Sequence, residues 1–147
     1  MRQEIKTNMI NQYMLAHGGR NSMTPADWGR VGQMCKNQYD FLDRFASDVA
    51  AGRYTEQQIA ARARMYVEAS AQAFERGKVL ARGMPDLPVY PSDGGTPCLS
   101  NCKCSWSISE FSDRWECRWS LADAEHCAGC VERAARFNPL VVQRNAA

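Results

Sequence analysis

The chain has 147 residues, with 18 basic and 16 acidic side chains and a net charge of +2, which suits one ordinary globular domain. No stretch approaches the roughly eighteen consecutive apolar residues of a membrane span, so we expect no transmembrane helix and no membrane partner. The first residues, MRQEIKTNMI, carry charge where a signal peptide needs an apolar core. We therefore expect a reducing, cytoplasmic setting, in which clustered thiols favour metal binding over disulfides.

The N-terminal half has the pattern of amphipathic helices. A first helix is expected from Arg2 to His17, followed by a GGRN turn. Thr24 is the expected N-cap of a second helix, which begins at Pro25 and ends near Gly52. Its apolar residues recur every three or four positions: Trp28, Val31, Cys35, Tyr39, Leu42, Phe45 and Val49. Cys35 is therefore predicted to be a core residue.

A third helix is predicted to run from Thr55 to Gly83. Thr55 and Gln58 can form a capping box at its start. Small residues such as Ala73 and Gly77 follow one side and would allow another helix to approach closely. Because the connections are short, residues 1–83 are predicted to form an antiparallel helical bundle.

Residues 84–97, MPDLPVYPSDGGTP, contain four prolines and two glycines and exclude regular structure. We interpret them as an ordered or semi-rigid arm between the helical bundle and the cysteine-rich region. Because such segments lose little entropy on docking, Leu87, Val89 and Tyr90 are candidate partner-binding residues for a neighbouring subunit.

Residues 98–147 combine a predicted β-hairpin with a helix. Polar and large side chains alternate in CKCSWSI and RWECRWS, as they do in strands. The predicted antiparallel register places three pairs on one face: Trp106 with Trp115, Cys104 with Cys117, and Cys102 with Trp119. The connecting loop would be Ser109–Ser112. A helix is then expected from Ala122 to Phe137.

The cysteine positions indicate a structural zinc site. Six of the seven cysteines lie between Cys98 and Cys130. Zinc prefers four nitrogen or sulfur ligands that two chain segments deliver as close pairs. The candidate ligands are Cys98, Cys102 and Cys104 from one segment and Cys127 and Cys130 from the other. We favour Cys98, Cys102, Cys127 and Cys130, with Cys104 as a substitute and His126 as a further possible ligand.

Other interpretations of this region remain open. Cys104 and Cys117, opposite each other in the predicted register, could form a cross-strand disulfide or be small buried side chains. Catalysis is not expected, because HCAGC lacks the H-x-E that accompanies a catalytic zinc in deaminases. The alternative function is a zinc-ribbon nucleic-acid-binding factor, in which Trp106, Trp115 and Trp119 would stack on bases.

The motif order resembles that of a known family. A helical segment like RARMYVEASAQAFERG is followed by LPVYPSDGGTPCLSNCKCSW, a tryptophan-rich hairpin and AEHCAGCVERAARFNPL. This order, over about residues 54–140, resembles phage minor head or head morphogenesis proteins of the Mu-like head morphogenesis family, in its C-terminal cysteine-rich type. The segment NCKC is similar to the HPNCRC close of that family, although here the C-x2-C pair follows this segment and does not precede it.

The resemblance implies a non-enzymatic structural protein of a tailed-phage virion, in low copy number or in a ring. Its partners would be capsid or portal proteins, with a possible homo-oligomer, and it would occupy the host cytoplasm during assembly. The predicted fold is mainly α with a small β-hairpin. It comprises the helical bundle (1–83), the arm (84–97) and a zinc-ribbon-like hairpin and helix (98–147).

Overall fold

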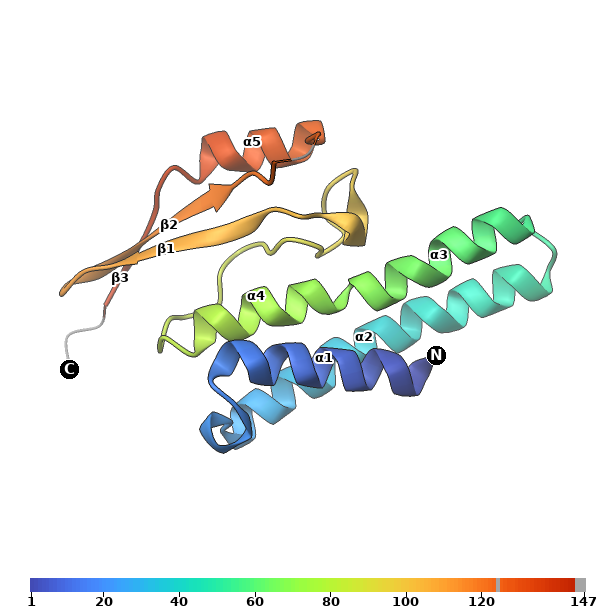
Figure 1. The fold of residues 1–147 in the computed structure, drawn as a ribbon, viewed down its shortest axis with the longest axis horizontal. Helices are drawn as coiled ribbons and strands as arrows, with labels where there is room; N and C mark the ends of the chain where they lie inside the picture. The colour runs from blue at the N-terminus through green and yellow to red at the C-terminus, as the bar shows by residue number, and fades with distance from the viewer. Residues whose placement is uncertain (124, 145–147) are drawn as a thin grey trace.

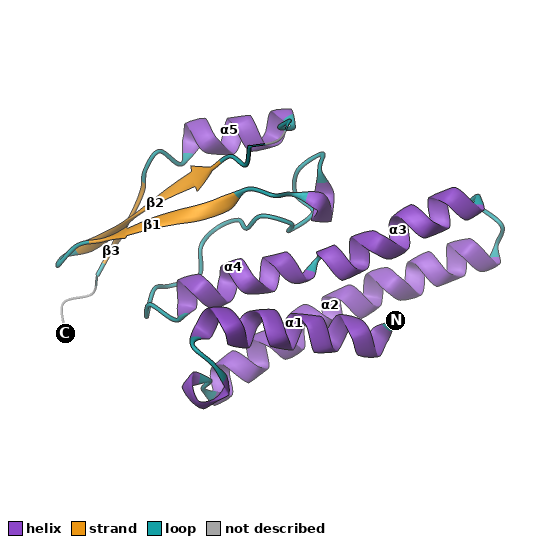
Figure 2. Ribbon diagram, viewed as in Figure 1, coloured by secondary structure: helices purple, strands orange, loops and turns teal. Residues whose placement is uncertain are grey.

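The protein is mainly helical, with a small antiparallel sheet. A computed structural model describes residues 1–123 and 125–144. The helices of the N-terminal half pack together as a bundle, and the sheet and the last helix lie together on one side of it (Figure 1). The colouring by secondary structure separates the same two parts (Figure 2). Within the described residues, no helix is both long and apolar enough to cross a bilayer.

The predicted helices of the first half are confirmed, with one difference. They are α1 (Arg2–His17), α2 (Pro25–Ala50), α3 (Glu56–Glu68) and α4 (Ser70–Leu80), and a short 3-10 helix, η1 (Arg20–Ser22), joins α1 to α2. The helix expected from Thr55 to Gly83 is thus divided at Ala69, which is buried. The two parts pack against different helices. Helix α4 packs along α1, whereas the start of α3 lies against the end of α2 (Figure 1).

The close approach of α1 and α4 depends on a small residue. A Cβ atom at Gly77 would lie 2.8 Å from the backbone oxygen of Tyr13. Real Cβ atoms do not come so near to a carbonyl oxygen, so any larger residue at position 77 would push the two helices apart. The predicted role of the small residues on this helix is therefore confirmed at this crossing.

The start of α2 is held by a buried carboxylate. Thr24 and Asp27 form the predicted capping box, in which the Thr24 hydroxyl accepts from the Asp27 N–H at 3.2 Å. Asp27 is only 3% exposed; it also accepts a hydrogen bond from the Tyr13 hydroxyl at 2.9 Å and pairs with Arg30. Burial alone would raise the pKa of Asp27, but hydrogen bonds from Thr24 and Tyr13 outweigh it and lower this pKa to about 2.

Stability is therefore expected to fall in acid as Asp27 takes up a proton. The pKa of this carboxyl is lower in the folded chain than its ordinary value of 3.8. Its contribution, about 2 kcal/mol, is present above pH 4 and is lost as the pH falls towards 2. Urea denaturation at several pH values should show a smaller loss for Asp27→Asn than for the wild type. The variant Asp40→Asn, changed at an exposed position of α2, should behave as the wild type; equal acid sensitivity in all three proteins would contradict the prediction.

The sheet has three strands in the order β1–β2–β3. They are β1 (Ser105–Glu110), β2 (Arg114–Ser120) and β3 (Leu140–Gln143), and both pairings are antiparallel. The predicted hairpin exists, but its register is different: Trp106 pairs with Trp119, and Cys117 pairs with Ile108. The Trp106 and Trp119 rings then meet edge to face, 5.3 Å apart. Because the offset is an even number of residues, the predicted inward face is kept.

The C-terminal helix is shorter than predicted, and β3 was not predicted at all. Helix α5 (Ala128–Arg136) begins only after Cys127, whose backbone is extended. The predicted start of this helix at Ala122 is therefore wrong. Residue 124 lies outside the described residues. After α5 the chain returns antiparallel to β2 as β3, and its Val142 packs against the core.

Residues 84–97 contribute side chains to the core. Leu87 and Tyr90 are 6% and 4% exposed, and Val89 is half-buried, all three in one apolar cluster with the tryptophans of the sheet. Val89 also accepts a hydrogen bond through its backbone oxygen from the Trp106 indole at 3.0 Å. The prediction that Leu87 and Tyr90 offer their side chains to a partner is therefore wrong, because these side chains fill the core between α4 and the sheet.

A buried ion pair joins the helices to the sheet. On α4, Glu75 accepts a hydrogen bond from the Trp106 N–H at 2.8 Å, and Lys78 donates one to the Trp106 carbonyl oxygen at 2.7 Å. Glu75 and Lys78 also pair with each other at 2.8 Å. The backbone N–H and carbonyl oxygen of Trp106 are thus satisfied by side chains of α4 at the edge of β1, where no strand is adjacent.

Candidate metal centre

Three cysteine sulfur atoms from two distant segments lie together, and the sulfur of a fourth cysteine, Cys127, lies next to one of them. The Sγ atoms of Cys98, Cys102 and Cys130 all lie within 4.8 Å of one another, so these three residues could hold a metal ion. The Cys98–Cys130 and Cys102–Cys130 sulfur distances are 3.6 and 3.5 Å. The Cys127 sulfur lies 3.5 Å from that of Cys98. In a tetrahedral zinc site with Zn–S bonds of about 2.3 Å, neighbouring sulfurs are about 3.8 Å apart. The observed spacing is close to this value.

The first pair of thiols is positioned by a short turn. Cys98 and Cys102 lie on either side of the 3-10 helix η2 (Leu99–Asn101). The Asn101 N–H donates a hydrogen bond of 3.0 Å to the Cys98 carbonyl oxygen and closes this turn. The Thr96 hydroxyl lies 3.1 Å from the Cys98 sulfur. The buried Ser92 hydroxyl donates to the Cys102 carbonyl oxygen at 3.1 Å, which ties this turn to residues 84–97.

The second pair lies at the N-terminus of α5. Cys127 is the N-cap residue, and the Cys130 N–H donates to its carbonyl oxygen at 3.0 Å. Gly129, between them, packs so closely on residues 96 and 97 that a Cβ atom would lie 3.1 Å from Pro97. The two segments are therefore held in contact by the protein, and the positive end of the helix dipole favours thiolates at this end of α5.

The electrostatics differ between the thiols. Burial would raise the pKa of Cys127, but hydrogen bonds from the backbone N–H groups of Cys130 and Cys98 and from neighbouring thiols lower it to about 6. Burial raises the pKa of Cys98 and, together with the neighbouring thiols, that of Cys130. The lowered pKa of Cys127 favours its thiolate form, which is the form of cysteine that binds a metal ion.

The remaining candidate residues lie around this cluster. Cys104, His126 and Glu125 line a hollow of about 290 Å³ together with the cluster cysteines. Cys117 is fully buried under the sheet, opposite Ile108 and not Cys104. Both cysteines are free, so the structure contains no Cys104–Cys117 disulfide. Cys35 is buried on α2, as predicted.

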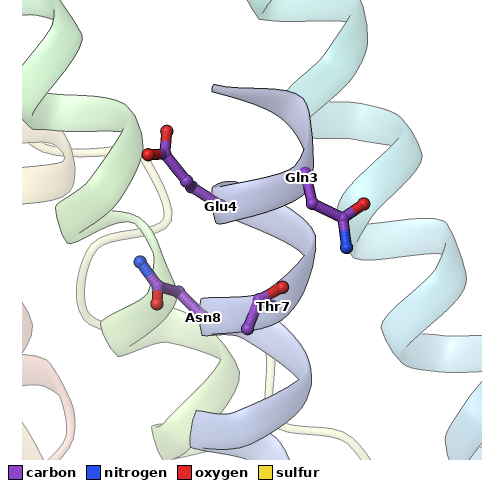
Figure 3. A pocket seen from close by; sticks show the side chains of 4 residues that line it. All are labelled: Gln3, Glu4, Thr7 and Asn8. Carbon is purple, nitrogen blue, oxygen red and sulfur yellow. The ribbon is translucent and has the colours of Figure 1, made fainter.

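A hollow of similar size on α1 has different chemistry. It is lined by Gln3, Glu4, Thr7 and Asn8, and in Figure 3 Gln3 points away from Glu4 and Asn8. These side chains do not converge on a common point. We therefore place the candidate site at the thiol cluster.

Comparisons of the chain with protein-family models, with curated proteins and with solved structures found no match. The assignment of a function therefore depends on the cysteine geometry and on the motif order of the sequence.

Proposed function

We propose that the protein is a structural component of a tailed-phage head that acts through protein–protein contacts and is stabilised by one structural zinc ion. The main support is the convergence of the Cys98, Cys102 and Cys130 sulfurs within 4.8 Å of one another, with the Cys127 sulfur 3.5 Å from that of Cys98. Cys98, Cys102, Cys127 and Cys130 are the proposed ligands. An all-sulfur, tetrahedral donor set that is closed by the protein suits zinc in a structural role.

The surroundings of the cluster support a stabilising role for the ion. The sulfurs border an apolar cluster that contains Trp106, Trp115 and Trp119 and connects the sheet, α5 and residues 84–97. The small sheet has few strands with which to bury this cluster. An ion that joins η2 to α5 would therefore fix the outer part of the protein, since metal binding becomes folding free energy.

The virion assignment is supported by the motif order that resembles the Mu-like head morphogenesis family. We expect the purified, reduced protein to contain one zinc ion per chain by elemental analysis, and mass spectrometry to detect the chain in purified phage heads. Protein without zinc would contradict the metal site, and heads without the chain would contradict the virion role. The two parts of the proposal can therefore fail separately.

The alternative, a nucleic-acid-binding factor, loses its main support in the structure. The three sheet tryptophans are 2–6% exposed, so they cannot stack on bases in this fold. On α4, Arg76 pairs with Asp86 and Lys78 pairs with Glu75. Salt-dependent binding to DNA oligonucleotides would favour this alternative. A catalytic activity that is lost on replacement of Glu125 or His126 would instead favour an enzyme.

A further inference from the structure

The sulfurs of the candidate metal centre are close enough to react with one another. Three sulfur contacts of 3.5–3.6 Å join Cys98 to Cys127, Cys98 to Cys130 and Cys102 to Cys130. Each of these contacts crosses from the turn at η2 to the first residues of α5. In Figure 1 the first turn of α5 and the loop that leads into β1 lie at the same end of the sheet. Sulfurs in such contact can form a disulfide, with a bond of about 2 Å, after small side-chain rotations.

The contacts define one complete set of pairs. The two contacts of 3.5 Å, Cys98–Cys127 and Cys102–Cys130, share no residue and together use all four thiols. The third contact, Cys98–Cys130 at 3.6 Å, would leave Cys102 and Cys127 as partners. In the described part of the chain, these two sulfurs make no hydrogen bond with each other. Oxidation of the cluster is therefore expected to link the two segments twice.

The two pairs differ in their access to solvent. Cys98 and Cys127 are partly exposed, whereas Cys102 and Cys130 are 4% and 1% exposed. A dissolved oxidant therefore reaches the outer pair, Cys98 and Cys127, before the inner pair. Because the outer pair supplies two of the four proposed ligands, its oxidation is expected to release the zinc ion.

The protein itself holds the two segments in contact when the ion leaves. Gly129 of α5 packs on the preceding loop so closely that a Cβ atom would lie 3.1 Å from Pro97. The buried Ser92 hydroxyl fixes the Cys102 backbone through a hydrogen bond of 3.1 Å to its carbonyl oxygen. Thiols that lose the ion therefore keep their partners within reach.

We propose that the thiol cluster has a second, oxidised state, in which the Cys98–Cys127 and Cys102–Cys130 disulfides replace the zinc ion and keep η2 attached to α5. The inference rests on the proposed function for its setting, because a phage head is assembled in a reducing cytoplasm and then released into an oxidising medium. The fold of the sheet and α5 would then be preserved in both surroundings.

The oxidant in this reaction is a peroxide. A sulfur of the outer pair attacks hydrogen peroxide, so that an S–O bond forms, the O–O bond breaks and hydroxide leaves. The second sulfur of the pair then attacks the first, so that the S–S bond forms, the S–O bond breaks and a second hydroxide leaves. The inner pair reacts in the same way. In total, four thiolates give four electrons to two peroxide molecules, which take up four protons and become four molecules of water.

Addition of hydrogen peroxide to the reduced, zinc-loaded protein tests the inference. The number of free thiols, counted after denaturation, should fall by two with each disulfide, from seven to five and then to three. A chromogenic indicator should detect zinc release during the first of these stages. Peptide mapping without reduction should find Cys98 linked to Cys127 and Cys102 linked to Cys130. The local pairs Cys98–Cys102 and Cys127–Cys130, or a disulfide to Cys104, would overturn the inference.

Two double variants provide a matched comparison, since each lacks two of the proposed ligands. Cys98→Ser/Cys127→Ser leaves Cys102 and Cys130 in contact, and it should form this disulfide. Cys98→Ser/Cys130→Ser leaves Cys102 and Cys127, and it should form a disulfide at least about tenfold more slowly, because its sulfurs are not held together. Equal rates in the two variants would overturn the inference.

Fluorescence of the wild type shows whether the disulfides replace the ion. In the presence of a chelator, the oxidised protein should keep its native tryptophan fluorescence, and a shift equal to that of the reduced protein would overturn the inference. Reduced protein without zinc would contradict the proposed metal site, but disulfide mapping in that metal-free protein would still test the pairing. Zinc binding without the two disulfides would overturn this inference and leave the metal site intact.

Discussion

Loss of the metal is expected to unfold the sheet and α5 while the first two helices keep much of their structure. The apolar cluster among α1, α2, α3 and α4, which includes Ala73 of α4, is separate from the cluster that contains Trp106, Trp115 and Trp119. With metal present at a thousandfold above its Kd, removal would decrease the free energy of unfolding by about 4 kcal/mol. Treatment with a chelator under reducing conditions should shift tryptophan fluorescence to longer wavelength, because three of the four tryptophans lie in the outer cluster.

Single substitutions identify the ligands behind this effect. Cys130→Ser should lower stability by a similar amount and remove the response to chelator, because Cys130 lies at the centre of the sulfur contacts. Cys117→Ser is the matched control, because it changes a fully buried thiol of the same apolar cluster. Among the described residues, the Cys117 sulfur makes no hydrogen bond with the other cysteine sulfurs, so this variant should keep the response to chelator. A chelator response in Cys130→Ser equal to that of the wild type would contradict the proposed site.

Replacement of Glu75 by alanine is expected to loosen the attachment of the sheet to the helices, with a loss of about 3 kcal/mol. Glu75 is 6% exposed and joins the Trp106 N–H to Lys78. Without its carboxylate, the Trp106 N–H at the edge of β1 has no acceptor, and the Lys78 ammonium loses its counter-charge. Both effects weaken the contact between α4 and β1, because Lys78 also donates to the Trp106 carbonyl oxygen.

Hydrogen exchange locates this effect in the chain. In Glu75→Ala the Trp106 amide should exchange much faster than in the wild type, while amides in the middle of α2 should be nearly unchanged. Glu75→Gln, which keeps an acceptor for the Trp106 N–H, should lose less stability than Glu75→Ala. Glu132→Ala, at an exposed position of α5, is the control. Equal stability of Glu75→Ala and this control would show that the ion pair does not hold the sheet.

Local patterns predicted most of the helices because their signals lie within a few residues. The capping box of Thr24 and Asp27, the spacing of apolar residues in α2 and the small residues at the α1–α4 crossing are properties of neighbouring positions. The paired spacing of the cysteines is also visible in the chain and predicted a metal site, and the structure brings the sulfurs of Cys98, Cys102 and Cys130 together. The inward face of the hairpin was also predictable, since alternation fixes which side chains share a face.

The hairpin register, β3 and the place of residues 84–97 depend on contacts between distant parts of the chain. Trp106 lies opposite Trp119 in a cluster that Phe137 also joins, and no local pattern distinguishes this pairing from the one with Trp115. Leu87 and Tyr90 occur in a proline-rich segment that looks extended, but they fill the space between α4 and the sheet. Local spacing therefore sufficed for the helices, for their buried faces and for the expectation of a thiol cluster. The strand register and the burial of Leu87 and Tyr90 required the folded chain, because both depend on partners that are distant in the sequence.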